Sequence, residues 1–262
     1  MLVPDLLHEF ELGVWKALFM HLICVLYAAA PDGSLVAELN KQWDSYLEFC
    51  HALNCQTSRF HDIPTFGSST IRCFASNASE MKKLAAHDFE DLLQVRDYSR
   101  KWMIVLKMPP SVQHSCLRRP SSGTHNMMVR MLLYRTAEWH AFSKLQLHTE
   151  STLNHLKKLT TELRRLMHKF RDVTKSDFAT FELPQEMAAQ KRHSKGKETE
   201  EIGNPKSTSQ KPKILNLFTY KWHDLADYVH SIHLFGGTDG FSTQLVGTLY
   251  SNLETYLLII LW

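Results

Sequence analysis

The sequence predicts a mainly α-helical protein. Apolar residues recur at steps of three and four in several stretches, whereas the strict alternation that marks a half-buried strand is scarce throughout. Proline and glycine interrupt this pattern at a few positions, as they do where helices stop. The chain has 262 residues, of which 44% are hydrophobic and 22% charged, so it is long enough to bury a core and has an ordinary globular composition.

The first predicted helix runs from Asp5 to Ala30. Pro4 followed by Asp5 suits a helix start, and Pro31-Asp32-Gly33 is a clear stop signal. Taken by itself, Asp5 is expected to serve as the N-cap, with its side-chain oxygen accepting a hydrogen bond from a backbone N–H of the first turn. The apolar residues that follow the helical period are Leu6, Phe10, Val14, Leu18, Leu22 and Val25.

Further helices are predicted from about Ser79 to Gln94 and from Tyr220 to Phe235, while segments 40–72 and 95–125 are irregular. The strongest periodic signal runs from Asn126 to Val173 and predicts one long helix or a helical hairpin. We expect its apolar stripe to pack in the core, with a short coiled-coil contact to a partner or a second copy as the alternative. The stripe consists of Leu145, Leu153, Leu156, Leu159, Leu163, Leu166 and Phe170.

Residues 186–213 are predicted to be a disordered charged linker, because they are rich in Lys, Glu, Ser and Pro and poor in apolar residues. This linker divides the chain into a helical domain at 1–185 and a C-terminal helical segment at 214–262. It holds seven Lys and Arg against four Glu, which leaves 23 basic and 23 acidic residues elsewhere, so it contains the whole net charge of +3. Outside the linker, net charge therefore gives no argument for DNA binding.

The chain is expected to be soluble and intracellular, and nuclear if it is functional. Five cysteines, an odd number without regular spacing, fit neither a disulfide framework nor a zinc module. The N-terminus has no basic start ahead of an apolar stretch, so no signal peptide is predicted. Lys16 and His21 interrupt the apolar residues 14–30, and the apolar run Tyr256–Trp262 is far shorter than the ~20 residues that cross a bilayer. No membrane partner is predicted.

Several common catalytic motifs are missing from the sequence, which has no G-x-S-x-G elbow, no glycine-rich phosphate loop and no H-E-x-x-H. Asp5 and His8 are better candidates. An Asp at a helix start can face a divalent metal ion, while a His three residues on orients a nearby phosphate or carboxylate. Two-metal phosphoryl transfer needs several converging carboxylates, so Asp5 alone does not make a site. His223, Asp227 and His230 share a helix face, which we expect to be exposed polar surface.

Five blocks of sequence follow one another in an order that is more specific than any single motif. They run from Pro4 to Lys16, Asn77 to Gln94, Arg135 to Ala141, Thr219 to Tyr228 and Phe235 to Gln244. The first reads Pro-Asp-Leu-Leu-His-Glu-Phe-Glu-Leu-Gly-Val-Trp-Lys, and the last ends in Phe-Ser-Thr-Gln. Together they resemble transposases of mushroom-forming fungi, in the Plavaka and Kyakuja–Dileera–Zisupton groups, which are relatives of the CACTA transposases.

The resemblance implies a ribonuclease-H-like (RNase H-like) core with an Asp-Asp-Glu triad that acts on DNA with Mg²⁺ or Mn²⁺, interrupted by a helical insertion. The family's second Asp, followed by two residues and His, matches Asp5 and His8, so Asp5 would be the metal ligand. The first Asp would lie on a strand upstream of Met1. The family's Glu follows the Phe-Ser-Thr-Gln block in a Glu-x-x-His pattern, which is not recognisable after Gln244, and Glu254 lacks that context. The implied fold is the helical insertion, with the β-sheet largely missing.

The sequence thus predicts a remnant of a DDE-type transposase, without catalytic activity and with no cofactor of its own. Segments 41–59, 95–125 and 245–262 depart from the relatives, as retained intron sequence or a frameshift would explain. Two alternatives stay open: a helical protein-interaction module that uses the 145–170 stripe, and a weak non-specific DNA-binding module that uses the lysines of the linker. Persistent dimerisation would favour the first, and a steep salt dependence of DNA affinity the second.

Overall fold

The computed structural model describes residues 3–40, 85–94, 122–184, 186–188, 192 and 210–243. Within these residues the mainly α-helical prediction is confirmed, because every named element is a helix and β-type pairing is limited to an isolated bridge between Phe181 and Pro212. The RNase H-like assignment stays a prediction. Nearly all of the predicted irregular segment 40–72 and the C-terminal residues 244–262 lie outside the described part of the chain.

The N-terminal helix is continuous from Leu6 to Ala29 and consists of the π-helical η1 (Leu6–Trp15) and α1 (Lys16–Ala29), in agreement with the predicted helix. The N–H of Lys16 donates to the carbonyl oxygens of Glu11 and Gly13, and the first of these bonds has the five-residue spacing of a π-helix. The helix ends where Ala30 becomes extended. Gly33 then adopts a φ of +75°, a conformation that favours glycine.

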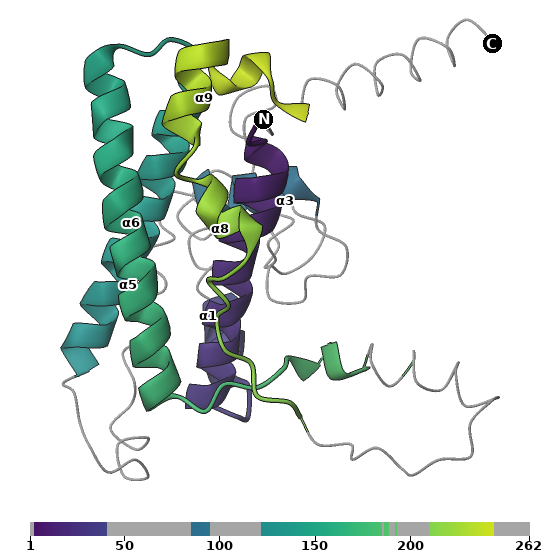
Figure 1. Ribbon diagram of the computed structural model, residues 1–262. Helices are drawn as coiled ribbons and strands as arrows, with labels where there is room; N and C mark the ends of the chain where they lie inside the picture. Colours follow the sequence, from purple (N-terminus) through teal and green to yellow (C-terminus); the bar gives the residue numbers. More distant parts are fainter. Residues whose placement is uncertain are drawn as a thin grey trace, which may run out of the picture.

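The apolar character of this helix is explained by packing. By length and composition alone, the helix Leu6–Ala29 could cross a membrane, because an 18-residue stretch of it has a mean hydropathy of 1.7. However, 67% of this stretch is buried inside the protein. In Figure 1, η1 and α1 run beside α5 and α6, and contacts join η1 to α1, α3 and α8. A helix surrounded in this way is apolar on most of its sides because most of its sides are buried.

The region predicted as a long helix or a hairpin is a hairpin, formed by α5 (Ser122–Ser143) and α6 (Glu150–Asp177). Helix α5 begins inside the segment 95–125 that the sequence predicted as a loop, so that boundary was wrong. Helix α6 begins with a capping box: the Thr149 hydroxyl accepts from the N–H of Thr152, and the Thr152 hydroxyl accepts from the N–H of Thr149. This pair of bonds fixes the start of α6.

The apolar stripe of α6 faces the core, as predicted. Leu156 and Phe170 are 0% exposed and Leu163 is 1% exposed, whereas Lys157 points to solvent. Leu145 is the exception, because it lies in the connection ahead of α6 and is 36% exposed, so its assignment to the stripe was wrong. Since α5 and the rest of the core cover the stripe, the surface suggested for a partner is already occupied within the chain.

Two short helices, α8 (Tyr220–Asp224) and α9 (Tyr228–Phe235), take the place of the single helix predicted over these residues. A turn at 225–227 separates them. His223, Asp227 and His230 are all exposed, as expected, but the turn means that they do not share one helix. The chain leaves α9 through Gly236, whose φ is +87°, and forms the short 3-10 helix η4 (Thr238–Gly240).

The end of the predicted linker pairs through its backbone with the segment that follows α6. The N–H of Lys213 donates to the carbonyl of Thr180, and the N–H of Glu182 donates to the carbonyl of Lys211. Most of segment 186–213 lies outside the described residues, so its disorder stays a prediction.

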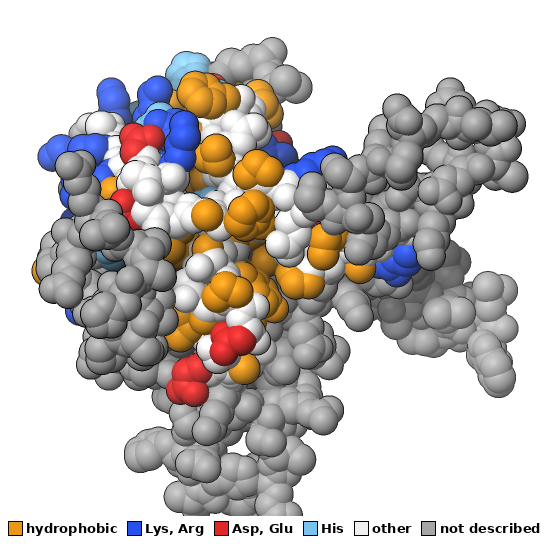
Figure 2. Space-filling model, turned by 90° about the horizontal axis from the view of Figure 1, so that it is seen from below, with side chains coloured by type: hydrophobic (Ala, Val, Ile, Leu, Met, Phe, Trp, Pro, Cys, Tyr) orange, Lys and Arg blue, Asp and Glu red, His pale blue; other side chains and the backbone are white. Residues whose placement is uncertain are grey.

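One hydrophobic core draws on every part of the described chain, with Trp15, Trp139 and Tyr228 among its fully buried side chains. Helix α3 (Ala86–Gln94) packs on η1 and contributes Phe89 to this core. Seen from below, hydrophobic side chains gather across the middle of the described surface, and most Lys and Arg lie toward the upper left, with a few on the right (Figure 2). Helix η1 contacts α1, α3 and α8, which come from different parts of the sequence. Polar side chains of η1 can therefore meet residues that are far away along the chain.

Candidate functional site

The predicted site residues Asp5 and His8 lie together at the start of η1 and contact the last described residues of the chain. Asp5 Oδ1 accepts from the Ser242 hydroxyl and from the Thr243 N–H, both at 3.2 Å. Asp5 Oδ2 is hydrogen-bonded to the Thr243 hydroxyl and to His8 Nδ1. The structure therefore joins Asp5 to residues 237 and 238 positions further along the sequence.

These hydrogen bonds favour the ionised form of Asp5. Burial alone would raise the pKa of its carboxyl group, but the hydrogen bonds from Thr243 and His8 outweigh burial and lower the pKa below its ordinary value. The carboxylate is thus ionised at neutral pH with both oxygens already accepting hydrogen bonds. A metal ion at Asp5 would have to displace some of these donors.

The side chain of Asp5 does not cap the helix, contrary to the prediction. Asp5 occupies the N-cap position with φ −95° and ψ 121°, but its side chain makes no capping hydrogen bond. Its oxygens are taken by Ser242, Thr243 and His8 instead. The N–H of Asp5 in turn donates to Glu9 Oε2 at 2.8 Å, which links the helix start to the next turn.

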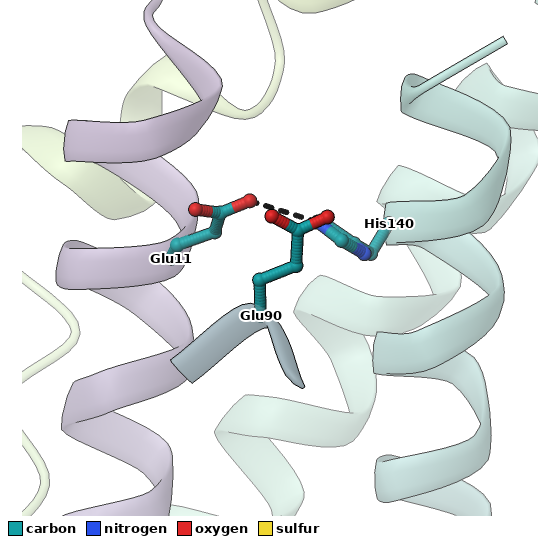
Figure 3. A group of neighbouring side chains, drawn as sticks. All are labelled: Glu11, Glu90 and His140. Atoms are coloured by element: carbon teal, nitrogen blue, oxygen red, sulfur yellow. Dashed lines mark hydrogen bonds and ion pairs between the residues drawn. The ribbon is translucent and has the colours of Figure 1, made fainter. Parts of the chain in front are cut away.

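A second group of polar side chains lies deeper in the protein, where η1, α3 and α5 meet. Glu11, Glu90 and His140 come from these three helices and point toward one another (Figure 3). Each offers one ligand atom, and these atoms all lie within 4.8 Å of one another. His140 Nε2 is 3.1 Å from Glu11 Oε1, and Lys144 Nζ forms an ion pair with Glu90 Oε1. Among the described residues, this is the group whose composition and spacing could hold a metal ion.

Burial dominates the electrostatics of this group. Glu11 is 1% exposed, His140 3% and Glu90 7%. Burial, followed by the charge of Glu90, raises the pKa of Glu11 to about 8. Burial, followed by the charge of Lys144, lowers the pKa of His140 to about 4. Both shifts disfavour the charged forms, so at neutral pH the Glu11 carboxyl group is mainly protonated and the His140 ring is neutral when no other cation is bound.

Aromatic packing fixes the positions of these side chains. The ring of Phe10 stacks on His140 at a centroid distance of 5.2 Å and on Trp139 at 4.6 Å. Trp15 Nε1 donates to the carbonyl oxygen of Phe89, the residue before Glu90, at 2.7 Å. Glu11 and Glu90 are therefore held by neighbours that are themselves buried and hydrogen-bonded or stacked.

Sequence reasoning did not single out Glu11, Glu90 or His140. A helical period identifies apolar faces and carries no information on which polar residues from separate helices will meet. One signal was present, because each of the three lies inside a block that carries the family resemblance: Pro4–Lys16, Asn77–Gln94 and Arg135–Ala141.

Comparison with known proteins adds no assignment: no family model, no curated protein and no solved structure matches this chain. The resemblance to fungal transposases thus stays a prediction from the sequence blocks.

Proposed function

We propose that this chain is the helical insertion of a transposase-related catalytic domain and that it does not cleave or join DNA itself. The observation that supports this proposal is the set of hydrogen bonds from Ser242 and Thr243 to Asp5. In the family that the sequence resembles, the insertion lies between the second Asp and the Glu of one active site, so its two ends must come together. Asp5 and the Phe-Ser-Thr-Gln block are the corresponding ends here.

The surroundings of Asp5 explain why the chain is expected to be inactive. Two-metal phosphoryl transfer requires several carboxylates that converge on the ions. In the described part of the chain, the group with metal-ligand spacing does not include Asp5. Its own oxygens are occupied by hydrogen-bond donors. Mg²⁺ or Mn²⁺ and DNA would be the cofactor and partner of complete relatives.

A nicking and strand-transfer assay with Mg²⁺ and Mn²⁺ tests the inactive assignment. Wild type, Asp5→Ala and Asp32→Ala are compared, because Asp32 is an exposed aspartate that bonds only to its neighbour Ser34 in the contacts described. We expect no activity from any of the three. Metal-dependent activity that is lost in Asp5→Ala and kept in Asp32→Ala would refute the proposal.

Translation of the flanking genomic DNA in all frames tests the family itself. We expect a strand-borne Asp upstream and a Glu-x-x-His downstream, which are the two missing members of the triad. If no frame encodes either motif, the transposase origin fails, whereas the fold and the assay result are unaffected.

Weak non-specific DNA binding is a second candidate function, favoured by the outer face of α6. Five basic side chains of this helix are exposed: Lys157, Lys158, Arg164, Arg165 and Lys169. A phosphate backbone attracts such a row, and each contact contributes to the salt dependence of binding. Replacing Arg164 and Arg165 with Gln should reduce the slope of log affinity against log salt by roughly two. An unchanged slope would exclude this face.

A further inference from the structure

We propose that Glu11, Glu90 and His140 form a binding site for one divalent transition-metal ion of the Zn²⁺ type, which fastens α3 to η1 and α5. This inference is independent of the transposase proposal, because none of the three residues contacts Asp5 in the hydrogen bonds described and no DNA chemistry is involved.

The geometry needs little adjustment to hold an ion. Ligand atoms at about 2.1 Å from a tetrahedral ion lie about 3.4 Å apart. Glu11 Oε1 and His140 Nε2 are 3.1 Å apart, close to that spacing. No pair in the group exceeds 4.8 Å, so the Glu90 carboxylate would move by about 1.4 Å at most. A change of that size lies within the reach of side-chain rotation.

An unsatisfied buried atom points to a missing ligand. Glu11 Oε2 is one of eight buried side-chain atoms among the described residues that have no hydrogen-bond partner, and its residue is 1% exposed. A buried polar atom without a partner is rare in native proteins and calls for an explanation such as a bound ion. A metal ion between the three side chains would coordinate the Glu11 carboxylate through one or both oxygens and would compensate its charge.

The donor set indicates the class of metal. One imidazole nitrogen and two carboxylates suit Zn²⁺, which commonly takes three protein ligands and a water molecule. Mg²⁺ prefers an all-oxygen, octahedral shell and fits this set poorly. Affinity should therefore follow Zn²⁺ over Mn²⁺, with Mg²⁺ weakest.

Lys144 lies on the more exposed side of the group. Its side chain is 31% exposed and pairs with Glu90, whose side chain is 10% exposed, so this edge is the open one. A lysine ammonium there competes with a metal ion for Glu90. Removing the lysine should thus strengthen metal binding, whereas it would only weaken a purely structural ion-pair network.

The site would add a further attachment to a short helix. Helix α3 has nine residues. The Phe89 carbonyl of this helix accepts from Trp15 Nε1, and its Glu90 carboxylate accepts from Lys144 Nζ. A metal ion shared with Glu11 and His140 would add a cross-link between three helices.

Metal binding by the full chain is the test. Protein stripped with EDTA is titrated with Zn²⁺, Mn²⁺ and Mg²⁺, and with Co²⁺ as a spectroscopic probe of the ligand shell. We expect one tight equivalent of Zn²⁺. Zn²⁺ at about a hundred times its Kd should raise Tm by roughly 5–10 °C.

Variants separate this site from the exposed histidines. Glu11→Gln, Glu90→Gln and His140→Gln should each weaken Zn²⁺ binding by more than the roughly 10–100-fold that loss of an outer-shell partner costs. Lys144→Ala should bind Zn²⁺ more tightly, and His230→Gln, an exposed control, should bind as wild type does. If Glu11→Gln or His140→Gln fails to fold, Glu90→Gln and Lys144→Ala still decide the matter. No tight equivalent in wild type, or affinity unchanged in Glu90→Gln and Lys144→Ala, would overturn the proposal.

Discussion

Leu156 and Leu163 lie two turns apart on the buried face of α6, and truncating each to alanine tests how closely the hairpin packs. Leu156 is 0% exposed and Leu163 1% exposed. Each substitution removes about three buried methylene groups, which corresponds to a loss of about 2.4 kcal/mol of hydrophobic stabilisation. The space left behind adds about 24 cal/mol per Å³ of cavity, which brings the total to roughly 3–5 kcal/mol for a site that cannot collapse.

The two positions should differ, because Leu163 lines a pocket to whose lining Leu156 does not belong. This pocket has a volume of about 180 Å³ and lies between α6 and the segment that carries Leu217 and Leu225. A side chain beside an existing space has fewer contacts to lose, so we expect about 2–3 kcal/mol for Leu163→Ala and about 3–5 kcal/mol for Leu156→Ala.

Urea unfolding followed by circular dichroism measures both free energies, with Lys157→Ala as an exposed control on the same helix. The control should stay within about 0.5 kcal/mol of wild type. A loss below about 1 kcal/mol for Leu156→Ala would mean that this face of α6 is not packed. A larger loss at Leu163 than at Leu156 would refute the role assigned to the pocket.

Two further predictions concern pH and backbone space. Burial, followed by the charge of Lys213, lowers the pKa of His21 to about 4. Neutral His21 therefore stabilises the fold above its ordinary pKa of about 6.5, and about 3 kcal/mol of this stability is lost as the pH falls toward 4. In urea unfolding at pH 7, 6 and 5, the free energy of unfolding should fall less steeply for His21→Gln than for wild type, and equal slopes would refute this prediction. A Cβ at Gly237 would lie 2.8 Å from Asp239 Oδ1 and 2.9 Å from the Gln146 carbonyl oxygen, so Gly237→Ala should destabilise the fold by roughly 1–3 kcal/mol and lower Tm. At Gly240 the nearest atom to an added Cβ is 4.0 Å away. Gly240→Ala should therefore unfold at a clearly higher Tm than Gly237→Ala.

The sequence predicted the helices well where an apolar face repeats over several turns. The N-terminal helix and the buried stripe of α6 are such cases, and both are confirmed. It predicted boundaries poorly where the change is local. The start of α5 falls in a segment without apolar period, and the turn at 225–227 interrupts a helix without a proline or glycine to mark it. Such breaks are set by packing of the flanking residues, which no local pattern reports.

For the candidate site, too, the sequence identified one part and missed another. Asp5 was identified from a motif, and its predicted role as a helix cap was wrong because Ser242 and Thr243, over 230 positions away, take its oxygens. The contacts of Asp5 therefore depend on how the whole chain closes. A local pattern could identify the residue but not its partners.

The π-type geometry of η1 contributes to the burial of Glu11. In an α-helix the residue one turn after Leu6 is Phe10. The α-helical period therefore predicts that Phe10 is buried and makes no such prediction for Glu11. Where bonds run from residue i to i+5, as from Glu11 to Lys16, each turn holds an extra residue, so both Phe10 and Glu11 lie about one turn beyond Leu6. Both are buried, at 0% and 1% exposed. The wider turn thus directs a carboxylate into the core beside His140, and a reading of the sequence at the α-helical period has no means of placing it there.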